Sequence, residues 1–153
     1  MKKPVIVIGL GNTLMSDEGA GVRVVERLLD IASRFPLVDF VDAGTAGMSI
    51  LHLIRDKDKA IFIDCARMGE KPGTIRKFTP QEIKSARVLA QQSLHDADLI
   101  KIVDLARQLG ECPSEIIIFG IEPEVIEPGT SLSKTLTSKI EHYVSFICRE
   151  IEN

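Results

Sequence analysis

The sequence predicts one three-layer α/β domain: a mostly parallel, twisted sheet of about five strands with helices on both faces. Short, continuously apolar runs alternate with segments whose apolar residues recur at helical spacing. Strands that are apolar throughout are typical of a parallel sheet covered on both faces, and alternation with helices favours the layered arrangement. The length fits a single domain over residues 1–153, with no repeat or linker.

The first half of the chain supplies three of the expected strands. They are Val5–Ile8, Leu37–Val41 and Ala60–Ile63. A glycine-bearing loop follows the first strand, and apolar residues over 22–32 then recur at helical spacing. The second strand leads into a turn over 42–47 and a short helix over 49–55.

The second half adds two strands and two helices. Thr74–Phe78 has the alternating polar residues of an edge strand, whereas Glu115–Gly120 is apolar enough to be buried. Helices are expected over His95–Leu109 and over about Ser133–Ile151. The polar, aperiodic stretch Thr79–Leu94 is expected to be partly a mobile loop.

Composition excludes several classes of function. The net charge of -3 argues against a nucleic-acid binder, which usually has a basic face. No run approaches the roughly 18 apolar residues of a membrane span, so we expect a cytoplasmic, monomeric protein with no membrane partner. Three cysteines at wide, irregular spacings indicate neither a disulfide framework nor a structural zinc site.

Acidic residues follow three of the predicted strands. Right-handed crossovers place the loops after parallel strands at one rim of the sheet, so Glu18, Asp42 and Asp64 should gather there. His95 opens a helix after a polar loop and can project onto the same rim. Crowded carboxylates repel one another, and a bound cation relieves that repulsion. Glu18, Asp64 and His95 are a plausible ligand set for a borderline divalent metal.

Simpler interpretations of these acids stay open. Asp17 and Glu18 fit the first turn of a helix, where acids complement the helix dipole. An acid such as Asp64 often does no more than end a strand.

A dinucleotide site is the first functional alternative, because Gly9-Leu10-Gly11 lies between a strand and a helix and Asp42 resembles a ribose-binding acid. Leu14 stands where the fingerprint requires Gly or Ala, and Asp17 and Glu18 would repel a pyrophosphate. A thiol mechanism at Cys65 is the second alternative. It is disfavoured because neighbours such as Asp64 and Cys65 point to opposite faces of a strand.

Five segments, in this order along the chain, resemble the nickel–iron hydrogenase maturation endopeptidases. They are 9–19 (GLGNTLMSDEG), 42–47 (DAGTAG), Ile63-Asp64, Ser93-Leu94-His95 and 120–124 (GIEPE) with the later Glu127-Pro128. The resemblance implies a twisted sheet flanked by helices, which agrees with the fold predicted above. It also implies removal of a short C-terminal extension from the precursor of the hydrogenase large subunit once nickel has been inserted.

The resemblance also implies roles for particular residues. Glu18, Asp64 and His95 are expected to contact nickel carried by the substrate, and zinc or another divalent ion is expected to substitute in vitro. Asp42 is expected to act close to the cleaved bond, together with Glu18 and Asp64. Three residues on the same loops are expected to bind substrate: Asp17, Gly44 and Thr45. A noncatalytic nickel or precursor docking protein, and a nucleotide or small-metabolite enzyme, remain the alternatives.

Overall fold

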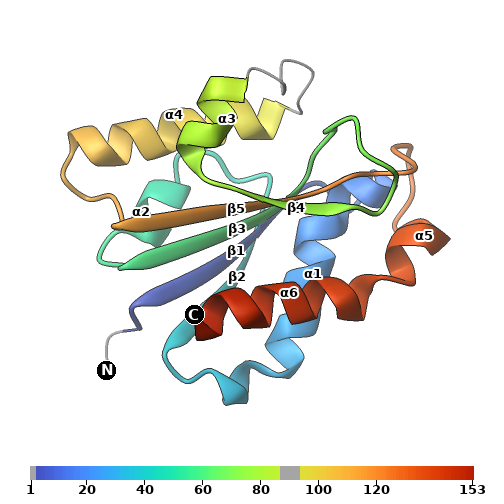
Figure 1. The fold of residues 1–153 in the computed structure, drawn as a ribbon, viewed down its shortest axis with the longest axis horizontal. Coiled ribbons are helices and arrows are strands. Elements are labelled where there is room, and N and C mark those ends of the chain that lie inside the picture. Colours follow the sequence, from blue (N-terminus) through green and yellow to red (C-terminus); the bar gives the residue numbers. More distant parts are fainter. Residues whose placement is uncertain (1–2, 87–93) are drawn as a thin grey trace.

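A five-stranded sheet forms the centre of the molecule (Figure 1). The computed structural model describes residues 3–86 and 94–153, with the backbone alone at 85–86 and 94–98. Its strands are β1 (Val5–Leu10), β2 (Val38–Gly44), β3 (Lys59–Cys65), β4 (Ile75–Phe78) and β5 (Glu115–Ile121). They lie in the order β2-β1-β3-β5-β4, and only β4 runs antiparallel to its neighbour. The predicted mostly parallel sheet is confirmed.

Helices cover both faces of this sheet: in Figure 1, α3 and α4 lie above it and α1 and α6 lie below it. One face carries α1 (Ala20–Asp30), α5 (Lys134–Thr137) and α6 (Ile140–Glu152). The other carries α2 (Ile50–Ile54), α3 (Pro80–Ala86) and α4 (Leu94–Gln108). Two short 3-10 helices, η1 (Ser16–Gly19) and η2 (Ala32–Arg34), lie before and after α1. Among the described residues, none of the helices has the length and apolar character needed to cross a bilayer.

Alternation along the buried strands divides the apolar side chains into two cores. Ile8 and Phe62 pack on the side of α2 and α4, whereas Val7, Ile61 and Ile63 pack on the side of α1 and α6. Successive residues of a strand point to opposite faces, so a run that is apolar throughout serves both cores. The continuous apolar runs of the sequence therefore have a direct structural reason.

The start of α1 lies unusually close to the ends of two strands. A Cβ atom at Gly21 would come within 2.0 Å of the carbonyl oxygen of Ile63 and 2.6 Å of that of Leu10. Real Cβ contacts are never so short, so glycine is required for this approach. The close packing fixes η1, which directly precedes α1, against the carboxyl ends of β1 and β3.

Two segments differ from the prediction. Pro80–Ala86, expected within a partly mobile loop, forms α3, because Thr79 and Glu82 make a capping box: Glu82 N donates to Thr79 Oγ1 (3.2 Å) and Thr79 N donates to Glu82 Oε1 (3.0 Å). The rest of that expectation, at 87–93, lies outside the described residues. The expected helix over Ser133–Ile151 is broken between α5 and α6 at 138–139, where the Ser138 hydroxyl donates to the Thr135 carbonyl oxygen (2.8 Å).

Candidate functional site

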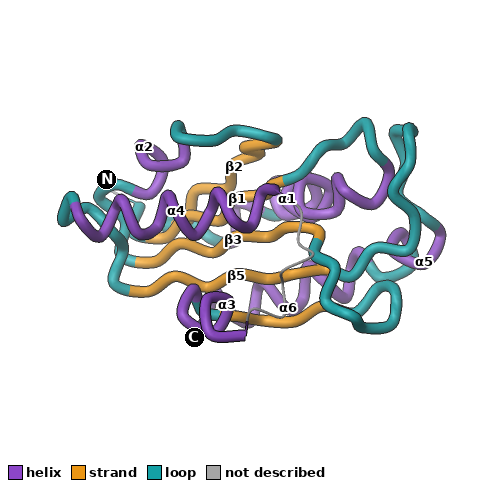
Figure 2. Tube along the Cα trace, turned by 90° about the horizontal axis from the view of Figure 1, so that it is seen from above, coloured by secondary structure: helices purple, strands orange, loops and turns teal. Residues whose placement is uncertain are grey.

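The loops that follow β1, β3 and β5 gather at one end of the sheet, on the right of Figure 2. We call this end, together with the end of β2, the rim. The rim loops comprise residues 11–19, 45–49, 66–74 and 122–133. Every predicted site residue before His95 lies on one of these loops or at the last positions of the strands that precede them.

Glu18 is held at the end of β1 by the tight fold of its own loop. It lies in η1 and is half-buried, and its N–H donates to the Met15 carbonyl oxygen (3.1 Å). Gly11 has a φ of 130°, and a Cβ there would lie 2.0 Å from the carbonyl oxygen of Glu18. Only glycine tolerates both the backbone conformation and this contact. The loop therefore brings Glu18 back over the strand that it has just left.

Asp64 lies inside β3 rather than after it and is almost completely buried, at 2% exposure. The Cys65 N–H donates to Asp64 Oδ1 (2.8 Å). By alternation with Phe62, Asp64 faces the side of the sheet that α4 covers, whereas Cys65 shares the opposite side with Ile63.

The electrostatics of Cys65 show how acidic the rim is. Burial raises the pKa of the Cys65 thiol well above its usual range, and the negative charges of Asp64, Glu18 and Asp17 raise it further. Arg67 lowers it only slightly by comparison. Because the thiolate is the reactive form, these conditions keep Cys65 an inert thiol. The burial of Cys65 and its raised pKa therefore argue against the thiol mechanism.

Asp42 lies in β2, two positions before its end and beside Gly9 of β1, and, unlike Asp64, it is exposed to solvent. Its Oδ1 accepts the N–H of Gly44 (2.9 Å), and Gly44 adopts a positive φ of 52°. The Gly44 carbonyl oxygen in turn accepts the N–H of Gly11 (2.8 Å), which ties the first two rim loops together. Thr45 follows and is exposed. An accessible carboxylate thus lies near the end of a strand that is joined to the loop of Glu18.

His95 lies in the first turn of α4. Because α4 runs back across the sheet to the start of β5, its first turn lies at the rim end (Figures 1 and 2). The imidazole itself is outside the described side chains, so its approach to Glu18 and Asp64 stays a prediction. Among the side chains that are described, no group of three His, Cys, Asp or Glu residues is placed to hold a metal ion.

Asp17 has a role that the sequence did not reveal. It is fully buried, and its carboxylate accepts three backbone N–H groups of the last rim loop: those of Glu124 (2.9 Å), Val125 (2.9 Å) and Ser133 (2.7 Å). A carboxylate enclosed in this way has no face open to a ligand. We therefore correct the expectation that Asp17 binds substrate: it fixes the 122–133 loop against the 11–19 loop.

Glu122 plays a similar part on the other side of the rim. Its buried carboxylate Oε1 accepts the N–H groups of Met68 (2.7 Å) and Glu70 (3.0 Å), which holds the 66–74 loop. The residue belongs to the segment 120–124, for which sequence reasoning gave no role. Its one sequence signal is an acid between a buried strand and a proline, which by itself does not indicate a loop anchor.

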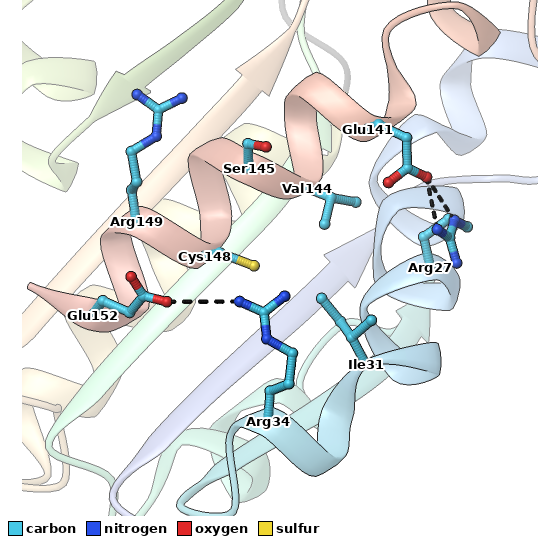
Figure 3. Close-up of a pocket in the computed structure, with 9 residues that line it drawn as sticks. All are labelled: Arg27, Ile31, Arg34, Glu141, Val144, Ser145, Cys148, Arg149 and Glu152. Atoms are coloured by element: carbon cyan, nitrogen blue, oxygen red, sulfur yellow. Dashed lines mark hydrogen bonds and ion pairs between the residues drawn. The ribbon is translucent and has the colours of Figure 1, made fainter.

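A hollow of about 420 Å³ between α1 and α6 lies away from the rim acids (Figure 3). Two of its three arginines already face carboxylates: Arg27 contacts Glu141 at 2.8 Å, and Arg34 approaches Glu152 at 4.0 Å. The third, Arg149, lies over the ring of Phe146. Charge that is already paired offers little attraction to an added anion. The hollow therefore gives no support to the nucleotide or small-metabolite alternative.

An α/β domain with a carboxylate-lined rim and an inert thiol fits a hydrolase. The comparisons with known proteins identify the class of hydrolase as an endopeptidase. The chain belongs to the hydrogenase maturation protease family, whose family model matches residues 22–150.

Individual relatives agree with this assignment. The chain is 35% identical over 142 residues to the hydrogenase 2 maturation protease of Escherichia coli, covering 90% of this chain and 84% of the relative. It is 30% identical over 141 residues to the hydrogenase expression/formation protein HoxM of Cupriavidus necator, covering 92% and 70%. The solved structure of the hydrogenase maturating endopeptidase HybD from Escherichia coli is similar with a TM-score of 0.85 at 28% identity, over 99% of this chain and 93% of that one.

Proposed function

We propose that this protein removes a short C-terminal extension from the precursor of a nickel–iron hydrogenase large subunit after nickel insertion. The observation that carries the proposal is the convergence of Glu18, Asp42 and Asp64 at one rim of the sheet, on loops fixed by Asp17 and Glu122. Fixed loops matter because a hydrolytic site must hold its groups close to the productive geometry.

In this proposal the nickel belongs to the substrate. Glu18 and Asp64, with His95 as the third ligand, contact the nickel that the precursor carries, and so report that insertion is complete. Two oxygen ligands and one nitrogen ligand leave positions open for the groups that hold nickel in the precursor, whereas a structural zinc site normally has four protein ligands. Zinc or another divalent ion is expected to bind the same groups in vitro, since affinity order alone does not select nickel.

Two routes for hydrolysis fit the residues. In one, the substrate-borne metal polarises the peptide carbonyl or activates water. In the other, Asp42, which is exposed and lies near the end of β2 where this strand is joined to the loop of Glu18, supplies general acid–base catalysis. A rate that falls with Asp42→Asn while the affinity for the precursor is kept would favour the second route.

The decisive experiment measures intact masses of the precursor. The protein is incubated with a nickel-loaded large-subunit precursor and, in parallel, with the nickel-free form. We expect a defined C-terminal peptide to be lost from the loaded form only. Stable binding without any mass change would support the docking alternative, and cleavage of both forms would refute nickel as the recognition element.

A further inference from the structure

Two large apolar side chains are exposed at the rim. Leu14, on the loop after β1, is 64% exposed, and Met48, on the loop after β2, is 57% exposed. The other exposed large hydrophobic residues of the described chain lie at the opposite end of the sheet: Leu29 late in α1, Leu37 just before β2 and Leu109 just after α4. Exposed apolar residues thus accompany both rim loops that carry an accessible site acid.

The exposure of Leu14 is not a result of a loose loop. The Leu14 N–H donates to Asn12 Oδ1 (2.9 Å), and its carbonyl oxygen accepts the N–H of Gly129 (2.9 Å). The next residues are held as well, because Ser16 N donates to the Gly129 carbonyl oxygen (2.9 Å) and Ser16 Oγ to that of Glu127 (2.8 Å). A backbone fixed on both sides holds an apolar side chain in water, where burial against a partner would be favourable.

Met48 is placed in a comparable way. Its carbonyl oxygen accepts the N–H of Leu51 (3.0 Å) at the start of α2, and its loop is tied to the loop of Leu14 by the hydrogen bond between Gly11 and Gly44. The two side chains therefore lie on rim loops that are joined by a hydrogen bond, and the same Gly44 also donates to Asp42. We call Leu14 and Met48 the apolar pair.

We propose that the apolar pair docks the polypeptide on either side of the cleaved bond, by contact with apolar side chains of the precursor. The inference rests on the proposed function. It commits to polypeptide as the occupant because the pair is continuous with the loops of Glu18 and Asp42, and a bond that reaches these acids brings its neighbouring residues over the same loops. An extended peptide presents side chains at regular intervals, so two separated apolar contacts also fix its position along the rim.

The test compares four near-isosteric polar substitutions in the full chain. Leu14→Gln and Met48→Gln change the apolar pair, and Leu29→Gln and Leu37→Gln are controls with exposed leucines at the far end (48% and 43% exposed). With the nickel-loaded precursor we expect each rim variant to raise KM about fivefold with kcat nearly unchanged, because docking contacts contribute equally to ground and transition states. Neither control should change KM.

Three results would overturn the inference. The first two are an unchanged KM in both rim variants and an equal rise of KM in the two control variants. The third is self-association of the parent that Leu14→Gln abolishes, because this would assign the pair to a contact between copies of the chain. If the parent leaves the precursor uncut, the proposed function fails by itself. Calorimetric affinity of the same variants for the precursor then decides the docking inference: weaker binding by the rim variants supports it, and unchanged binding refutes it.

Discussion

The acidic residues of the rim divide into two kinds. Asp17 and Glu122 are buried and accept backbone N–H groups, so their charge stabilises loops. Glu18 is half-buried and Asp42 is exposed, so both can meet a substrate. The same residue type therefore serves structure or function according to its burial and its hydrogen-bond partners.

Replacing Glu18 with Gln tests whether this accessible acid acts on the substrate. The side chain keeps its size but loses its charge, and because it is only half-buried we expect the melting temperature to change by no more than about 2 °C. Cleavage of the nickel-loaded precursor should fall at least about a hundredfold, since an amide is a weaker metal ligand. Mass spectrometry of a time course measures the rate. Cleavage as fast as that of the parent would show that Glu18 does not contact the metal.

Replacing Asp17 with Ala tests whether this buried acid stabilises the fold. Three backbone N–H groups lose their acceptor, and we expect the free energy of unfolding to fall by about 3 kcal/mol. Urea denaturation measures this change. Asp42→Ala is the matched control: its carboxylate is exposed and accepts one local N–H, so a loss of less than about 1 kcal/mol is expected. Equal losses in both variants would contradict the assignment of Asp17 as a loop anchor.

Among the elements, those with a strong apolar pattern were predictable and those held by specific polar contacts were not. Val5–Ile8 and Ala60–Ile63 are apolar because two cores enclose them, so their patterns indicated both the strands and the parallel sheet. The helix α3 has a weak apolar face, and its evidence in the sequence was the T-x-x-E pattern with proline at the first helical position. Thr79 and Glu82 therefore indicated the start of a helix, although the polar composition of the segment favoured a loop.

The capping box of α3 can be tested directly. Thr79→Ala removes the acceptor for the Glu82 N–H, and we expect a loss of about 1 kcal/mol in the free energy of unfolding. Hydrogen exchange of the α3 amides should be faster in the variant than in the parent, whereas that of the α1 amides should not change. The exposed Thr130 provides a control, since Thr130→Ala leaves this helix untouched. Unchanged exchange in α3 would mean that packing of Ile83, which is buried, holds the helix without its cap.

The sequence predicted where in the fold the candidate site lies, but not the hydrogen bonds that hold its loops together. Strand order and crossover handedness put Glu18, Asp42 and Asp64 at one rim, because the carboxyl ends of parallel strands share an edge. Nothing in the sequence told Asp17 from Glu18, because neighbouring acids in a first turn look alike until the partner loop is known. That partner loop lies more than a hundred positions further along the chain.

At the scale of the whole molecule, the two ends of the sheet have different electrostatics. The rim gathers acids, whereas the opposite end holds an ion cluster around the buried carboxylate of Glu150, which Lys59 contacts at 2.7 Å and the half-exposed Lys77 at 2.5 Å. Lys59 Nζ also donates to the carbonyl oxygen of Glu150 (2.9 Å). This cluster joins β3 and β4 to the last helix, so it links elements from both halves of the chain.

The cluster makes stability depend on pH. Burial alone would raise the pKa of Glu150, but the hydrogen bonds and charges of Lys59 and Lys77 outweigh it and hold this pKa below its usual 4.5. The stabilisation is therefore present above about pH 4.5 and is lost as the pH falls through the lower folded-state pKa. We expect the difference in unfolding free energy between the parent and Glu150→Gln to become smaller as the pH falls below about 4.5. Urea denaturation across pH 3 to pH 7 measures it, and a constant difference would refute the linkage.

The hydrogen bonds of Asp17 also make the support of the Glu18 loop depend on residues made much later during synthesis. The carboxylate of Asp17 takes its partners from residues 107 to 116 positions later in the chain. The loop of Glu18 therefore cannot acquire its full support until Ser133 has been added to the growing chain. A chain that stops before Glu124 contains Glu18, Asp42 and Asp64 but none of the N–H groups that hold the carboxylate of Asp17. The rim can therefore reach its final form only after residues 124–133 have been made.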